Sequence, residues 1–166
     1  NKRVALHEYP GAIGVTDAVI AVLSAIPGLE YVDLNMPRIG YQITSLRAMP
    51  EARQSLLART FQAAEDANVT TLAGVYHADH RELSAHEDAW PFEIVNFMDL
   101  IGEAMGLHRE DLFKRYKLMQ DVDAILAASR DMIERHNLDP EDVREIVLKD
   151  MLNEQLLPID RNLHPS

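Results

Sequence analysis

Apolar and polar residues alternate with two different periods along the first part of the chain. A short apolar run over 3–9, a helical pattern over 16–26 and a second short run over 29–34 predict a strand, a helix and a strand. Thr16 is expected to cap this helix, and Pro27-Gly28 to end it. A helix over 50–67 and a strand over 69–75 follow. This alternation predicts an α/β fold, with a Rossmann-like small parallel sheet flanked by helices.

The pattern changes after the third predicted strand. Residues 91–96 fit either a short strand or an extended lead into a helix over 97–105, and from 108 onward the period is purely helical, over 109–119, 122–136 and 140–152. The last helix begins at Asp139-Pro140, with Asp as the cap and Pro in the first helical position. We therefore expect an α/β domain over 1–107, a helical extension over 108–152 and an extended tail over 153–166.

Charge and composition exclude several classes of function. The net charge of −11, from 16 basic and 27 acidic residues, argues against nucleic-acid binding and favours basic partners or none. No apolar run reaches the roughly 20 residues of a membrane span, and 1–9 lacks the apolar core of a secretory signal, so we expect a cytoplasmic protein without a membrane contact. The absence of cysteine excludes disulfides and thiolate-bound iron–sulfur clusters within this chain. The sequence does not determine whether the chain forms a homo-oligomer.

The richest candidate site follows the third strand, where His77, Asp79 and His80 begin a polar segment. Imidazole and carboxylate together suit zinc or iron, which makes His77, His80 and His86 candidate metal ligands. Residues three apart share a face of a helix but not of a strand, so this site requires a helix that starts near His77. The alternative is a polar strand-end loop in which His80 caps or packs.

Three other features have two interpretations each. Arg38, after the second strand, could bind an anion in the same crevice or pair with a surface carboxylate. His7 ends the first strand and could face that crevice or be solvated. The Trp90-Pro91-Phe92 cluster could anchor a partner or fill the core.

An ordered set of positions resembles the cysteine-rich CCG domain of the heterodisulfide reductase B subunit. That family carries Gly-Cys after its first strand, Cys-Cys-Gly after its second and Cys-x-x-Cys after its third. The resemblance covers residues 3–107. The matching positions in this chain are Tyr9-Pro10-Gly11 before Ala12, Arg38-Ile39 before Gly40, Tyr76 with Asp79, the flanking His80 and Leu83, and Gly106-Leu107.

Every cysteine position of that pattern carries another residue here. The resemblance therefore implies the fold without the cluster chemistry: a non-catalytic, cluster-free accessory subunit of a heterodisulfide-reductase-like complex in sulfur metabolism, without a cofactor. Its partners would be iron–sulfur or flavin subunits, which would contact a crevice formed by Arg38, Tyr76, His77, Asp79 and His80. The alternative functions are a metal-binding protein or metal-dependent enzyme that uses His77 and His80 with zinc or iron, and a small-ligand or anion-binding protein around Arg38.

Overall fold

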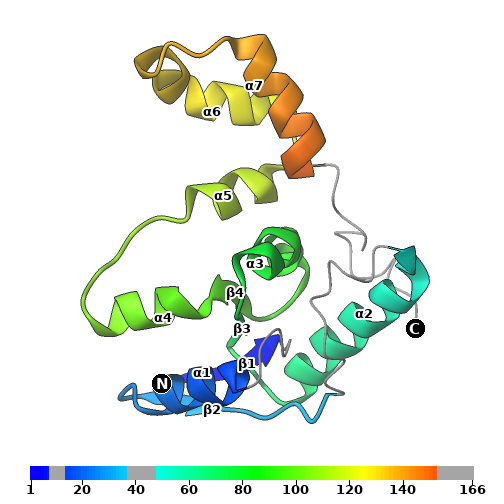
Figure 1. Ribbon diagram of the computed structural model, residues 1–166, viewed down its shortest axis with the longest axis vertical. Helices are drawn as coiled ribbons and strands as arrows, with labels where there is room; N and C mark the ends of the chain where they lie inside the picture. Colours follow the sequence, from blue (N-terminus) through cyan, green and yellow to red (C-terminus); the bar gives the residue numbers. More distant parts are fainter. Residues whose placement is uncertain (8–13, 37–47, 153–166) are drawn as a thin grey trace.

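The computed structural model describes residues 1–7, 14–36 and 48–152 (Figure 1). Residues Ser84–Ala89 (η2) form a 3-10 helix, and Val147–Leu152 (η3) form a π-helical segment that continues the helix over Pro140–Ile146 (α7). In chain order the elements are β1 (Lys2–His7), α1 (Val15–Ser24), β2 (Leu29–Tyr31), α2 (Pro50–Asp66), β3 (Thr71–Gly74), α3 (His77–Leu83), η2 (Ser84–Ala89), β4 (Glu93–Asn96), α4 (Phe97–Ala104), α5 (Leu112–Met119), α6 (Val122–Arg135), α7 (Pro140–Ile146) and η3 (Val147–Leu152).

The strands form one parallel sheet in the order β2-β1-β3-β4. His7 at the end of β1 pairs in register with Gly74 of β3, which in turn pairs with Asn96 of β4. The predicted fold, a small parallel sheet with helices on its faces and a helical C-terminal part, is confirmed. The ambiguous stretch over 91–96 contains the fourth strand.

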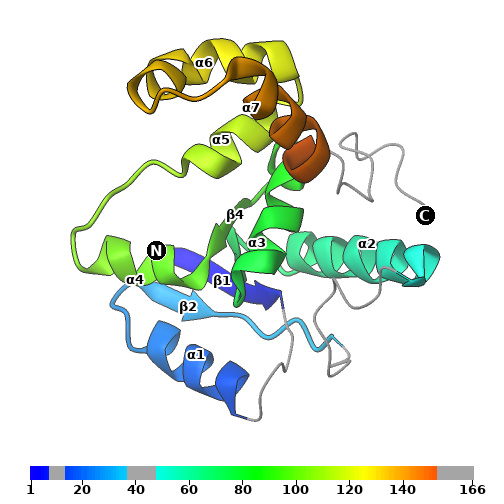
Figure 2. The same ribbon diagram turned by 45° about the horizontal axis from the view of Figure 1, so that its top comes forward.

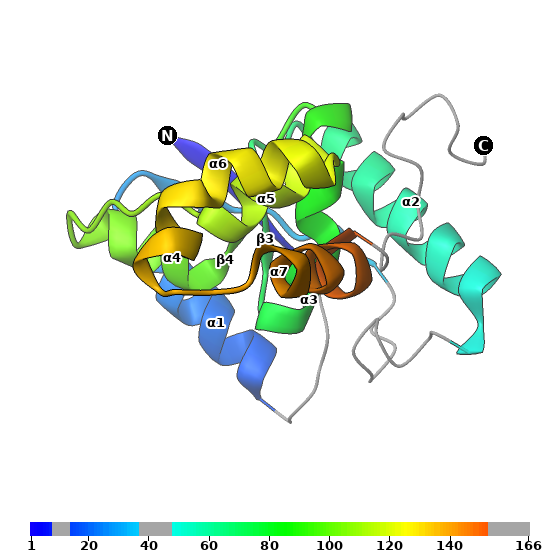
Figure 3. The same cartoon turned by 90° about the horizontal axis from the view of Figure 1, so that it is seen from above.

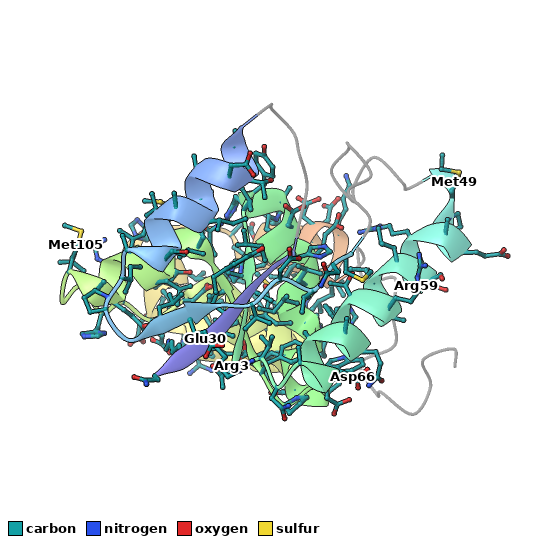
Figure 4. All side chains as sticks on the ribbon, turned by 90° about the horizontal axis from the view of Figure 1, so that it is seen from below. Arg3, Glu30, Met49, Arg59, Asp66 and Met105 are labelled. Atoms are coloured by element: carbon teal, nitrogen blue, oxygen red, sulfur yellow. The ribbon has the colours of Figure 1, made fainter. Side chains whose placement is uncertain are left out.

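Helices cover both faces of the sheet because buried side chains alternate along each strand. Val4 and Leu6 of β1 pack in one apolar cluster with α1 and α4, whereas Ala5 packs in another with α2 and η2. The arrangement has three layers, with α1 and α2 on opposite sides of the strands (Figure 2). At the sheet surface Arg3 of β1 pairs with Glu30 of β2, 2.5 Å from Nη1 to Oε1 (Figure 4).

The aromatic cluster lies in the α2 side of the core. Phe61 meets the rings of Trp90 and Phe92 edge to face, with centroids 5.3 and 5.9 Å away. Trp90 and Phe92 are both buried. The core interpretation of Trp90-Pro91-Phe92 is therefore confirmed, and these rings offer no anchor to a partner.

Two local predictions are wrong. Thr16 does not cap α1 but is buried within the helix. The cap position is occupied by Gly14, whose φ of 82° is a conformation that glycine adopts without strain. The second strand ends at Tyr31 rather than at 34. The Asp33 carboxylate accepts the N–H of Asn35, which has a φ of 52°, and this turn takes the chain away from the sheet edge.

The three predicted C-terminal helices are present with aspartates at their caps, but the first begins at Leu112 rather than at 109. Asp111, Asp121 and Asp139 each accept backbone N–H groups of the helix that follows. Seen from above, α5 and α6 lie over the sheet domain (Figure 3). Among the described residues no helix combines the length and apolarity that crossing a membrane requires. The predicted tail over 153–166 lies outside the described residues.

Candidate functional site

Helix α3 begins where β3 leaves the sheet and organises the candidate site. Tyr76 is extended, and its carbonyl accepts the N–H groups of Asp79 and His80 as the helix starts. The Asp79 carboxylate accepts the Tyr76 N–H at 3.4 Å. Because α3 starts at His77, its side chains separate onto two faces: Asp79 and Glu82 lie on one, and His77 and His80 on the other.

The first face belongs to a buried cluster of ionisable groups. Arg53 of α2 forms an ion pair with Glu82, and both side chains are 3% exposed. His7 and Asp79 are buried as well. Because β1 and β3 are neighbours that lead to opposite edges of the sheet, the cluster lies at the switch point of the strand order, where α/β proteins commonly bind ligands.

Burial determines the protonation of this cluster. It raises the pKa of Asp79 to about 7; the Tyr76 N–H opposes this increase, and neighbouring Glu82 adds to it. Burial, together with the nearby Arg53 guanidinium, lowers the pKa of His7 to about 3. Both groups therefore favour their neutral forms. These buried side chains connect α2, α3 and β1.

The second face of α3 opens onto a groove of about 1170 Å³. Its walls are α4 and α5, and the connection between them curves out at one side (Figure 1). Apolar side chains line much of it although they face solvent: Met98 is 56% exposed and Leu107 60%. The apolar lining residues are Val95, Met98, Leu107, Leu112, Phe113 and Leu118.

His80 joins α3 to the α5 side of this groove. Its Nε2 lies 2.5 Å from Oδ2 of Asp111, and the His80 side chain is 5% exposed. The other Asp111 oxygen accepts the N–H of Lys114 and so caps α5. Burial acts to raise the pKa of Asp111, but the Lys114 N–H and His80 outweigh it and hold this pKa below its ordinary value.

The residues of the predicted crevice therefore do not lie together in one site. Tyr76 is half-buried at the start of α3, His77 is exposed in the groove, His80 is bound to Asp111, and Asp79 points into the buried cluster. The position of Arg38 lies outside the described residues. His7, for which solvation was one interpretation, is instead buried at the end of β1.

The condition for a metal site at His77 is met, but its ligand set is not assembled. His77 and His80 share a helical face. His86 lies on η2, buried edge to face against Phe61 with centroids 5.5 Å apart. Across the part of the chain that the structure describes, no three histidine, aspartate or glutamate side chains gather in a way that could hold a metal ion.

Sequence reasoning missed Arg53 and Asp111, and it named Glu82 only as a neighbour of the histidines. Arg53 had a detectable signal, because it precedes Leu57 by one helical turn and so falls on the apolar face of α2. Asp111 is recognisable as a helix cap, but its pairing with His80 spans 31 positions and follows from no local pattern.

Comparison with protein-family models, with curated proteins and with solved structures finds no match to this chain. We therefore infer a function from the geometry of the groove and from the residues that line it.

Proposed function

We propose that this chain is a non-catalytic subunit that binds a partner protein through the groove between α4 and α5. The observation that carries the proposal is the exposure of Met98 and Leu107 inside a concave surface. Apolar side chains in such a place gain free energy when a partner removes them from water. Met98 also has the flexible, polarisable side chain that adapts to partner surfaces.

Charge favours a basic partner segment with apolar side chains. The chain carries a net charge of −11, which attracts cationic partners at long range. On the α5 side of the groove, Lys114 and Arg115 are already paired with Glu87 and Glu110. These two cations are therefore partly neutralised and repel a basic partner less.

The resemblance to the CCG domain supplies candidate partners. On this proposal the chain is a cluster-free accessory subunit of a heterodisulfide-reductase-like complex in sulfur metabolism, and its groove receives a segment of an iron–sulfur or flavin subunit. The absence of cysteine supports a role without the cluster chemistry of that family.

A matched pair of variants tests the groove. Met98→Asp places a charge in it, whereas Ile146→Asp does the same on α7 at nearly the same exposure, 58% against 56%. Each full-length protein is used to capture partners from a lysate of the source organism under gentle conditions. We expect an iron–sulfur or flavin subunit to bind the wild type and Ile146→Asp but to bind Met98→Asp about 10- to 100-fold more weakly.

Equal capture by all three proteins would refute the groove as the binding surface. Capture of neither an iron–sulfur nor a flavin subunit would refute the proposed complex. Because the partner is expected to be basic, its association should also weaken as salt is raised.

A second candidate function is zinc or iron binding at His77 and His80, favoured by the start of α3 at His77. His80 Nε2 already contacts Asp111, so a metal at that nitrogen would have to displace the carboxylate. Elemental analysis of tag-free protein tests this candidate, with His77→Ala as the control. Metal that is absent, or unchanged in His77→Ala, would eliminate it.

A further inference from the structure

In the structure the helical extension runs from Asp111, which caps α5, to Leu152 at the end of η3, and it has an apolar core of its own. Tyr116, Ile125 and Val147 pack together, with partly buried neighbours that all come from the extension. Among the described residues, the two apolar clusters of the sheet domain contain no member of the extension. The extension can therefore keep its core without being docked on the sheet domain.

Several charged side chains connect the extension to the sheet domain. Besides the His80–Asp111 pair, Lys114 of α5 donates to the Glu87 carboxylate at 2.8 Å and to the Ile94 carbonyl at 3.1 Å. Arg81 of α3 donates to the backbone carbonyl of Asp150 at 3.1 Å, and its guanidinium lies 5.7 Å from the ring centre of Phe113. Contacts of this kind weaken in salt far more than apolar packing does.

The covalent connection to the extension has the properties of a hinge. Gly106, shortly after the end of α4, has a φ of +75°, and residues 107–110, which lead to Asp111, belong to no helix or strand. Residues 107–110 are exposed, so a change in their backbone angles would displace little packed structure.

We propose that the extension is a lid that undocks from α3 and η2 as a unit and thereby opens the groove. The His80–Asp111 and Lys114–Glu87 pairs are its latch. Because α5 is one wall of the groove, undocking removes that wall while α4, on the sheet domain, stays in place. Control of partner binding by the lid rests on the proposed function, whereas the undocking itself does not.

Hydrogen exchange on the full chain tests the undocking. Asp111→Asn removes the latch charge and retains a good cap for α5, and Lys114→Met removes the second pair. Without the latch the docked state is less stable, so local unfolding of the extension requires less free energy. In the double variant we therefore expect amides of α5, α6 and α7 to exchange about 5- to 30-fold faster together, while those of β1 and β3 are unchanged. Raising salt from about 0.05 to 1 M should act in the same direction on the wild type.

Arg144→Gln is the matched control, because it breaks the pair with Asp123 inside the extension and leaves the latch intact. It should not separate the exchange of the extension from that of the sheet. Equal acceleration of both parts in the double variant, or no acceleration in either, would overturn the lid. If the double variant fails to fold, the salt series on the wild type replaces it. Faster exchange of the extension alone would then support the lid, and equal acceleration of both parts or none in either would overturn it.

Partner capture distinguishes the two proposals. If the extension undocks but no partner binds the groove, the proposed function fails and the lid stands. If a partner binds and sheet and extension exchange as one unit, the lid fails and the proposed function stands.

Discussion

The Arg53 guanidinium of α2 and the Glu82 carboxylate of α3 form a buried ion pair on the side of α3 that faces away from the groove. Each charge has lost most of its contact with water, so each depends on the other for stabilisation. This pair fixes α3 to α2, and through α3 it sets the position of His77 and His80.

Replacing one residue of this pair should lower the free energy of unfolding strongly, whereas replacing both should lower it much less. We expect Arg53→Met to lower the free energy of unfolding by about 3–5 kcal/mol, because Glu82 is left buried and unpaired. Arg53→Met with Glu82→Leu should recover most of that loss. Urea unfolding measures both, and a double variant as unstable as the single one would contradict this account of the pair.

Asp79 should weaken the fold as the pH rises. Its pKa in the folded protein is about 7, above the ordinary value of 3.8, so the folded state holds a proton that the unfolded state releases. The stability is complete below about pH 3.8 and is lost as the pH rises through 7. Asp79→Asn should therefore stabilise the protein at pH 8 relative to wild type by roughly 2–4 kcal/mol, with no such gain at pH 4. Thermal unfolding across this range provides the comparison, and a gain independent of pH would count against the raised pKa.

His7 should have the opposite pH dependence. Its pKa of about 3 lies below the ordinary 6.5, so the unfolded state binds a proton that the folded state excludes. Its contribution is present above pH 6.5 and is lost as the pH falls towards 3. Between pH 7 and 4, wild type should lose about 3 kcal/mol relative to His7→Gln. Parallel stability curves for the two proteins would refute this expectation.

Phe61 should be a large contributor to stability because it contacts both Trp90 and Phe92. We expect Phe61→Ala to cost about 3–5 kcal/mol of unfolding free energy and to shift the emission of Trp90, the single tryptophan, to longer wavelength. Leu138→Ala is the control, since Leu138 is 52% exposed and its truncation should cost about 0.5 kcal/mol or less. Equal costs for the two variants would argue against the packing described for Phe61.

Much of the fold was predictable because hydrophobic periodicity reports burial directly. The runs around Val4 and Leu72 and the helical spacing of Leu56, Leu57 and Phe61 each place apolar side chains on a face that the sheet then covers. Thr16 shows the limit of such reasoning. A residue type that suits a cap also suits the buried side of a helix, and the positive φ of Gly14 decides between them.

The start of a helix near His77 was predictable, whereas the arrangement of its side chains was not. The segment from Tyr76 to His80 does start a helix at a strand end, yet Asp79 and His80 diverge because neighbouring positions on a helix point about 100° apart. Their partners, Arg53 with Glu82 and Asp111 with His80, come from distant elements that only the tertiary fold brings close. The family resemblance, the partner and the metal stay predictions.

In mildly acidic solution, Asp79 and His7 together bind the same number of protons in the folded protein as in the unfolded chain. Near pH 5 the folded protein holds one proton on Asp79 that the unfolded chain lacks, and lacks one on His7 that the unfolded chain holds. The two differences cancel, so between about pH 4 and 6.5 folding through these groups neither takes up nor releases protons. Although the pKa values of Asp79 and His7 are both strongly shifted, the two groups together do not change the free energy of unfolding between about pH 4 and 6.5. A change in stability over this pH range would have to come from groups outside the cluster.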